Sequence, residues 1–243
     1  MLNRILSTAL CCTLAVSFAC AQSVNKLTRA EKKEGWQLLF DGKTSKGWRG
    51  AFSKEFPKHG WVVENGTLTG KLQGGGESAR AGDIITEKKY KDFELVFDWK
   101  LDSGGNSGVK YFILEPAVKP EKNASLIGYE YQLIDDAHYI YQGKPLGPKF
   151  KTASIYEVVA ADKPDVKVGG WHTSRIRVKN NLIEHWLDGK KVLEVDRKSD
   201  RFIKGVADGK FRDHPGFATI REGHILLQDH GHGVSFRNVK IRE

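Results

Sequence analysis

The chain has 243 residues, with 39 Lys and Arg against 30 Asp and Glu, which gives a formal net charge of +9. The basic residues are scattered without a run of four or more, so they serve solubility better than a nucleic-acid interface, and we expect no nucleic-acid partner. After Ala21 no apolar stretch approaches the ~20 residues that cross a bilayer, so we expect no membrane span.

The first 21 residues are typical of a secretory signal peptide. Arg4 precedes an apolar run over residues 5–18, and Ala19-Cys20-Ala21 supplies the small residues of a cleavage site. We therefore expect an exported protein, periplasmic or secreted. All three cysteines lie within this segment, so the exported chain would hold no disulfide. The alternative is a lipid anchor on Cys20, although Ser17-Phe18-Ala19 lacks the aliphatic residue usual in a lipoprotein signal.

The next segments predict a short helix and then strands. Residues 22–34 form a leader in which Leu27 to Glu34 makes one or two helical turns, and residues 35–243 form a single domain. A hairpin is predicted over residues 61–70, because the central Asn65-Gly66 pair favours positive φ at both turn positions. Residues 93–101 alternate apolar and mostly polar side chains, which indicates a strand with one face in the core.

The second half of the chain continues this pattern. Strands are predicted over residues 109–114 and 129–134, and a further hairpin over residues 182–195 turns at Asp188-Gly189 beside a strand at 175–179. A short helix is expected within residues 199–213. The closing run 223–243 is a strand, a polar turn and a second strand, with a β-bulge near Arg237-Asn238 that reconciles two phases of apolar residues.

Many short strands, frequent glycine turns and six tryptophans indicate an all-β fold. We predict a two-sheet antiparallel sandwich of the jelly-roll kind with one or two short helices. The chain contains no internal repeat.

Several blocks in order resemble the 3-keto-disaccharide hydrolase domain family. They are residues 38–42 with Gly47-Trp48, 61–70, 90–95, 104–112, 128–136, 185–189 and the closing run. The resemblance implies a concanavalin-like or laminin-G-like jelly roll whose concave face binds a glycoside or oligosaccharide. It also implies a hydrolase or lyase that cleaves glycosides oxidised to a ketone at C3, by hydrolysis or by elimination.

That chemistry needs three groups. A C3 ketone acidifies the hydrogen on C2, so a general base can remove it while a cation or hydrogen-bond donor stabilises the enolate. An acid then assists departure of the glycosidic oxygen, and water adds later at C1. A glycosidase pair of carboxylates is therefore unnecessary.

The strand at 129–134 carries the first candidates. Its alternation places Glu130 and Gln132 on one face, and the family block favours a site there over an ordinary solvated face. Lys110 is in phase with Gly108 on its own strand, so its ammonium could hold the enolate oxygen. Its alternative role is a surface lysine with a buried stem.

Two histidines complete the catalytic candidates, which are Glu130, Lys110, His185 and His230. His185 shares a strand face with Ile183 and Leu187, where a core role is the usual one, but an unperturbed pKa near ~6.5 suits proton transfer. His230 follows Gln228 and Asp229 directly in the closing turn. His232 ranks below it, because nothing else in the chemistry requires it.

The candidate substrate-binding residues offer amides, a carboxylate or an aromatic face. They are Asn106, Gln132, Asp135, Gln228 and Trp186. Asn106 lies in a glycine-rich turn, where tolerance of a left-handed conformation is the alternative. For most tryptophans core packing is the default.

We expect no metal in the catalytic site and no cofactor, since no regular ligand spacing is present. The close group Asp135, Asp136 and His138 could nevertheless hold calcium or another divalent ion. Two other functions stay open: a non-catalytic carbohydrate-binding module, and a conventional glycoside hydrolase that uses Glu130 and Asp135. The oligomeric state does not follow from the sequence.

Overall fold

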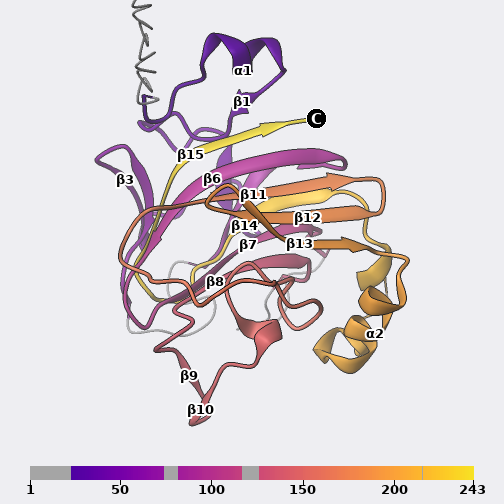
Figure 1. Cartoon of the computed structure of the whole chain (residues 1–243). Helices are drawn as coiled ribbons and strands as arrows, with labels where there is room; N and C mark the ends of the chain where they lie inside the picture. The colour runs from indigo at the N-terminus through magenta and orange to yellow at the C-terminus, as the bar shows by residue number, and fades with distance from the viewer. Residues whose placement is uncertain (1–22, 74–81, 117–125, 215) are drawn as a thin grey trace, which may run out of the picture.

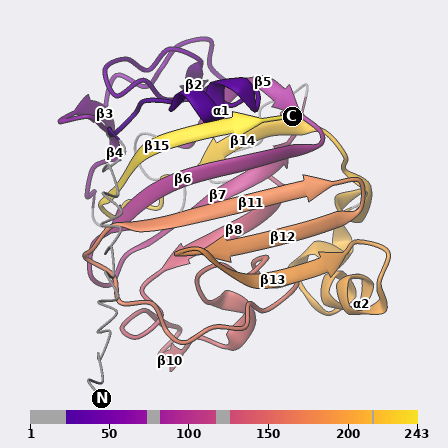
Figure 2. The ribbon, with the colours of Figure 1, turned by 45° about the horizontal axis from the view of Figure 1, so that its top comes forward.

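The computed structural model describes residues 23–73, 82–116, 126–214 and 216–243. Two antiparallel β-sheets lie face to face in this part of the chain (Figures 1 and 2). The predicted all-β jelly-roll sandwich is confirmed. The signal peptide lies outside the described residues, so export stays a prediction. None of the described helices is long and apolar enough to cross a membrane.

The larger sheet, which we call sheet A, has eight strands. In spatial order they are β13 (Lys190–Asp196), β12 (Leu182–Leu187), β11 (His172–Lys179), β6 (Phe93–Leu101), β15 (Val234–Arg242), β4 (Thr67–Gly70) and β3 (Trp61–Glu64), with β1 (Gln37–Leu38) beside β15. The predicted Asn65-Gly66 turn joins β3 to β4 with φ of 49° and 72°, a backbone that favours asparagine and glycine. The predicted meander of β11, β12 and β13 is also confirmed.

The smaller sheet, sheet B, has five strands and carries the polar residues of interest. In spatial order they are β2 (Trp48–Gly50), β5 (Ile84–Tyr90), β14 (Gly223–Leu227), β7 (Asn106–Ile113) and β8 (Tyr129–Ile134). A separate two-stranded hairpin, β9 (Ile140–Tyr141) and β10 (Lys144–Pro145), follows β8 and projects from the body of the molecule (Figure 1).

The helices are short, as predicted. α1 (Arg29–Lys33) begins with a capping box between Thr28 and Glu31, and α2 (Asp200–Asp208) begins at the Ser199 cap. The described residues also form three short 3₁₀ helices: η1 (Pro148–Phe150), η2 (Lys210–Asp213) and η3 (Phe217–Thr219).

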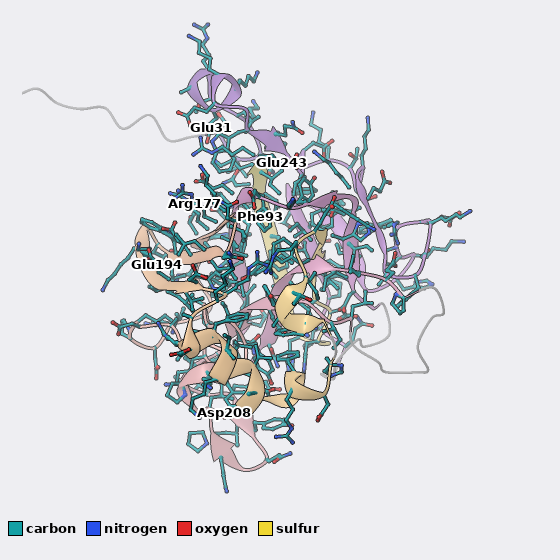
Figure 3. The ribbon with its side chains drawn as sticks, turned by 90° about the vertical axis from the view of Figure 1, so that its right-hand side faces the viewer. Glu31, Phe93, Arg177, Glu194, Asp208 and Glu243 are labelled. Carbon is teal, nitrogen blue, oxygen red and sulfur yellow. The ribbon has the colours of Figure 1, made fainter. Side chains whose placement is uncertain are left out.

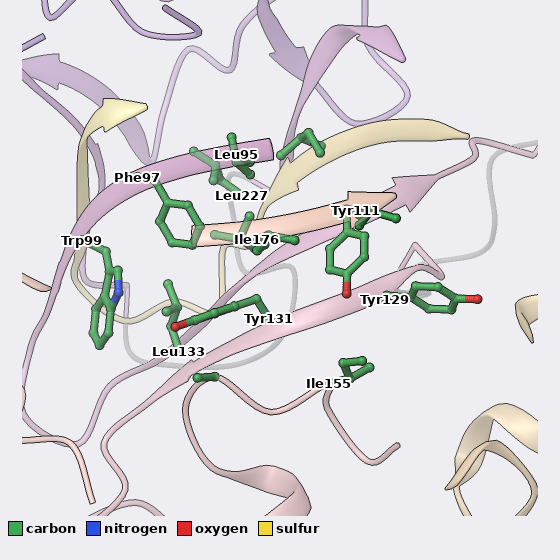
Figure 4. Close-up of a cluster of buried hydrophobic side chains, with 14 of the residues drawn as sticks. Leu95, Phe97, Trp99, Tyr111, Tyr129, Tyr131, Leu133, Ile155, Ile176 and Leu227 are labelled. Carbon is green, nitrogen blue, oxygen red and sulfur yellow. The ribbon is translucent and has the colours of Figure 1, made fainter. Parts of the chain in front are cut away.

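The hydrophobic core lies between the sheets, where alternate residues of each strand point inward (Figure 4). Phe97 and Trp99 of β6 enter from sheet A, and Tyr111 and Tyr131 enter from sheet B. The rings of Phe97 and Tyr131 meet edge to face with centroids 5.7 Å apart. Because this packing uses the inward residues of β7 and β8, the other residues of those strands are left for the outer face of sheet B.

The closing run links the two sheets. β14 and β15 form as predicted, and the register of β15 shifts between Arg237 and Lys240, with Asn238 at φ 51°, as the predicted bulge requires. The two strands do not pair with each other: β14 lies in sheet B between β5 and β7, while β15 lies in sheet A between β6 and β4. The turn at residues 228–233 therefore crosses from one sheet to the other.

Candidate active site

The outer face of sheet B brings a cation and a carboxylate together on neighbouring strands. Lys110 of β7 is the register partner of Glu130 of β8, so their side chains stand on the same face. The Lys110 Nζ lies 3.8 Å from the Glu130 Oε2, and the two residues are only 4% and 7% exposed. A buried ion pair of this kind is costly to build, which favours a chemical role over a purely structural one.

A glycine shapes this pair. A Cβ built on Gly108 would lie 2.5 Å from the Glu130 Oε1 and 3.0 Å from its Cδ and Cγ. The carboxylate of Glu130 therefore lies across β7 in the space that any other residue at position 108 would fill. The sequence pattern of Gly108 and Lys110 in phase reflects this arrangement.

Amides lie next to the ion pair on the same face. The Gln132 Nε2 donates to the Asn106 Oδ1 over 3.4 Å, and Gln132 is 1% exposed. Its Oε1 has no hydrogen-bond partner among the described residues. Gln228 follows β14 and is held to β7 through its backbone, since its N–H donates to the Gly108 carbonyl over 2.9 Å. A buried amide oxygen without a donor is able to accept a hydrogen bond from a substrate hydroxyl.

Three half-buried rings border this group of amides. The imidazoles of His230 and His232 stack with centroids 5.4 Å apart at 19°, and the ring of Tyr139 meets His232 edge to face at 6.1 Å. The Asn106 Nδ2 donates to the Tyr139 hydroxyl over 3.4 Å, which joins the rings to the amides. Burial lowers the pKa of His232, while backbone carbonyls of Asn106 and His230 act in the opposite direction.

The turn that carries these histidines is organised by a carboxylate. The Asp229 Oδ1 accepts from the Gly231 N–H over 3.0 Å, and the Asp229 N–H donates to the Asp83 Oδ1 over 2.9 Å. The Gln73 Nε2 also approaches the Asp229 Oδ2 at 3.5 Å. His230 is thus presented from a turn that is fixed on both sides.

His185 does not lie with the other candidates. It is fully buried in the core, where its Nδ1–H donates to the Ala153 carbonyl and its Nε2 accepts from the Tyr111 hydroxyl over 3.0 Å. Burial lowers the pKa of His185 to about 4, with the hydrogen bond to Ala153 acting against that shift. The ring is neutral and screened from any sugar, so we leave His185 out of the site.

Asp135 organises a loop. Its carboxylate accepts from the backbone N–H groups of Gly104, Ala137 and His138 and from the His138 ring. Burial alone would raise the pKa of Asp135, but these hydrogen bonds outweigh it and hold the pKa below its usual range. In this arrangement the Asp135 oxygens accept these hydrogen bonds within the loop, and the role of Asp135 in substrate binding or hydrolysis stays a prediction.

The neighbouring Asp136 is also occupied. It accepts from the backbone N–H groups of Thr152 and Val166 and pairs with Lys163. Within the described residues no group of three or more His, Cys, Asp or Glu side chains is arranged to hold a metal. The calcium suggested for Asp135, Asp136 and His138 stays a prediction.

Trp186 lies on the other side of the molecule, on the outer face of sheet A. Its register neighbour Arg175 places a guanidinium 5.0 Å from the indole centroid. The same arrangement recurs on this face, where Arg237 covers Trp171 at 4.0 Å and Arg242 covers Trp36 at 4.9 Å. These aromatic faces are occupied by cations, so Trp186 is not available to stack on a sugar at sheet B.

Two surface depressions also lie at this end of sheet A. The larger, of about 330 Å³, includes Arg177 and Glu184. The smaller, of about 240 Å³, includes Phe93, Arg177 and Glu243, three residues that Figure 3 labels. Their carboxylates are engaged: Glu184 with Arg177 and Lys191, Glu243 with Lys88. The group on sheet B is therefore our candidate active site, because it combines an ion pair, a buried amide oxygen with no hydrogen-bond partner among the described residues, and two imidazoles.

Sequence reasoning found part of this group and missed the rest. Lys110, Glu130, Gln132, Asn106, Gln228 and His230 were named from strand phase or family blocks, and they lie on β7, β8 and the segment that follows β14. Tyr139 was missed and His232 was ranked low. The alternation of His230 and His232 around Gly231 was the available signal for His232, while Tyr139 lies in a loop that has no periodic pattern.

The sequence of the chain matches the sequence model of one protein family. The model described as a 3-keto-alpha-glucoside-1,2-lyase-like domain matches residues 35–242. The chain belongs to this family. The match spans both sheets and every residue of the site, and it confirms the resemblance drawn from the sequence blocks.

Proteins similar to this chain have names that refer to the hydrolysis or binding of carbohydrates. A 3-keto-disaccharide hydrolase of Bacteroides thetaiotaomicron is 29% identical over 241 residues, which cover 91% of this chain and 83% of the relative. A crystal structure described as a glycosyl hydrolase of Parabacteroides distasonis is 34% identical with a TM-score of 0.79, covering 90% of this chain and 99% of that one. The carbohydrate-binding module CBM66 of Bacillus subtilis, 16% identical with a TM-score of 0.50 and covering 81% and 96% of the two chains, shares the fold alone.

Proposed function

We propose that this chain is an exported enzyme that cleaves 3-keto-glycosides at the glycosidic bond. The observation that carries the proposal is the buried pair of Lys110 and Glu130 on the outer face of sheet B. Membership of the family and the names of its relatives support the choice of substrate.

In the first step Glu130 removes the proton from C2. The C2–H electron pair moves into a C2–C3 double bond, and the C3 ketone oxygen becomes an enolate oxygen beside the Lys110 ammonium. The cation stabilises the charge that develops only in the transition state and intermediate, so it lowers the barrier. Gln132 and Asn106 orient the sugar hydroxyls through their amides.

In the second step the enolate collapses. The C3 ketone reforms, a C1–C2 double bond appears, and the C1–O bond breaks with its electron pair leaving on the aglycone oxygen. His230, at the border of the site, donates the proton that this oxygen needs. Water added across C1 and C2 then gives the free 3-keto sugar, so that elimination and hydration together amount to hydrolysis.

The proposal is tested with purified protein and a methyl 3-keto-α-glucoside in D₂O. We expect cleavage of the glycoside and exchange of the C2 hydrogen for deuterium, both followed by proton NMR. Glu130→Gln should lose C2 exchange and at least about 100-fold of kcat/KM, because a general base contributes 10²–10⁴ to such a rate.

The control is Glu184→Gln, which removes a carboxylate that is equally buried, 6% against 7% exposed, but lies on the outer face of sheet A. It should keep both activities. Binding of the keto sugar without cleavage would indicate a carbohydrate-binding module instead. Cleavage of the unoxidised glucoside at a comparable rate would indicate a conventional glycoside hydrolase and would overturn the keto-sugar mechanism.

A further inference from the structure

The β9–β10 hairpin rises directly from the border of the active site. Tyr139, whose ring contacts His232 and whose hydroxyl accepts from Asn106, is the residue before β9. Its own N–H donates to the Asp135 carbonyl over 3.0 Å, and the Asp135 side chain fixes the turn just before it. The base of the hairpin is therefore tied to Asp135, the first residue after the strand that carries Glu130 and Gln132.

The hairpin itself exposes a ring to solvent. Tyr141 is 55% exposed, and among the Phe, Trp and Tyr side chains of the described ranges it alone lies largely in solvent. The turn Gln142-Gly143 has φ of 50° and 75°, a tight geometry that holds β9 against β10. Tyr141 follows Tyr139 by two residues, so the two backbones lie within about 7 Å of each other and the exposed ring is close to the border of the site.

We infer that Tyr141 binds the leaving group of the substrate, as a stacking surface for its ring. A pyranose or an aromatic ring both present a flat, largely apolar face, and burial of Tyr141 against such a face removes its exposed area from water. The inference rests on the proposed function, because it assigns the sugar that is cleaved to the Lys110 and Glu130 side. Tyr141 is then a specificity-determining residue, which favours substrates with a ring beyond the glycosidic oxygen.

The experiment measures binding of probes that carry no ketone. Dissociation constants of methyl α-glucoside, phenyl α-glucoside and an α-linked glucose disaccharide are determined by calorimetry for the wild-type protein, Tyr141→Ala and Tyr141→Phe. We expect the wild type and Tyr141→Phe to bind at least one ring-bearing probe about three- to tenfold more tightly than the methyl probe. Tyr141→Ala should bring this ratio close to one.

Preference for the phenyl probe alone identifies an aromatic leaving group, and preference for the disaccharide alone identifies a sugar. Ile203→Ala is the matched control, since Ile203 is 53% exposed but lies on α2, and it should keep the wild-type ratio. An unchanged ratio in Tyr141→Ala, or no preference or no binding in the wild type, overturns the inference. If only the proposed function is wrong, the ratios of dissociation constants follow the expectation, but the wild-type protein does not cleave 3-keto-glycosides.

Discussion

At the scale of single residues, the site depends on a glycine, which has no side chain. Gly108 has no Cβ, and the Glu130 carboxylate occupies that space next to Lys110. The obstacle to a larger residue is the far end of a flexible side chain, which moves at little cost. Position 108 should therefore affect catalysis much more than folding.

Gly108→Ala is expected to push the carboxylate of Glu130 away from its present position. Because a displacement of about 1 Å costs on the order of 100-fold in rate, kcat/KM for a 3-keto-glycoside should fall by about 10- to 100-fold. The urea midpoint should change little. Gly170→Ala is the control, since a Cβ there meets nothing within 4 Å, and it should keep both values. Equal losses of stability and activity in Gly108→Ala would argue against a positioning role.

Residues on strands were the predictable part of the site. Alternation along β8 separated Glu130 and Gln132 from the core tyrosines correctly, and the same rule placed His185 beside Ile183 and Leu187 in the core. The catalytic role considered for His185 stays a prediction, but its buried position in the core does not favour that role, as the strand phase already indicated. Tyr139 could not be found this way, because loop residues reach the site through long-range contacts.

At the scale of elements, the crossover between β14 and β15 determines where the histidines lie. The turn leaves sheet B after Leu227 and enters sheet A at Val234, and Asp229 holds it through the Gly231 N–H. The sequence indicated both strands but not their separate sheets, since pairing partners far apart in the chain leave no local signal. The pattern of strand, turn and strand in residues 223–243 is the same for a hairpin as for a crossover between sheets.

Asp229→Ala should loosen this turn. Loss of a side-chain to backbone hydrogen bond lowers the free energy of unfolding by about 1 kcal/mol, and the less ordered His230 should reduce kcat/KM at least about threefold. Asp41→Ala removes a bond of the same kind, since the Asp41 Oδ1 accepts from the Lys43 N–H, but in a turn between β1 and β2. It should leave kcat/KM unchanged. Full activity in Asp229→Ala would show that the turn does not orient the histidine.

At the scale of the whole molecule, His185 connects the two sheets. It lies on β12 of sheet A and accepts from the Tyr111 hydroxyl on β7 of sheet B. The neutral ring suits this place, since protonation would put a charge in the core and remove the acceptor at Nε2. Because of this contact, the free energy of unfolding should depend on pH.

The pKa of His185 is about 4 in the folded protein and near ~6.5 when unfolded, so the unfolded chain binds more protons between these values. The stabilisation is complete above pH ~6.5 and is lost as pH falls towards 4, on the order of 3 kcal/mol in total. Urea unfolding of the wild type and His185→Gln at pH 7.5, 5.5 and 4.5 measures it. The variant should be less stable at pH 7.5 but lose less on acidification. Parallel pH profiles would rule out this origin.

The two outer faces of the sandwich differ: the outer face of sheet B, the front, carries the candidate site, and the outer face of sheet A, the back, carries tryptophans that lie against arginines. On the outer face of sheet A, Trp36, Trp171 and Trp186 each lie against an arginine, whereas the residues of the candidate site lie on sheet B. The enzyme can therefore be immobilised on a solid support through the back, with the front still turned to the solution. A polysaccharide that contacts the outer face of sheet A meets these arginine–tryptophan pairs instead of the candidate site.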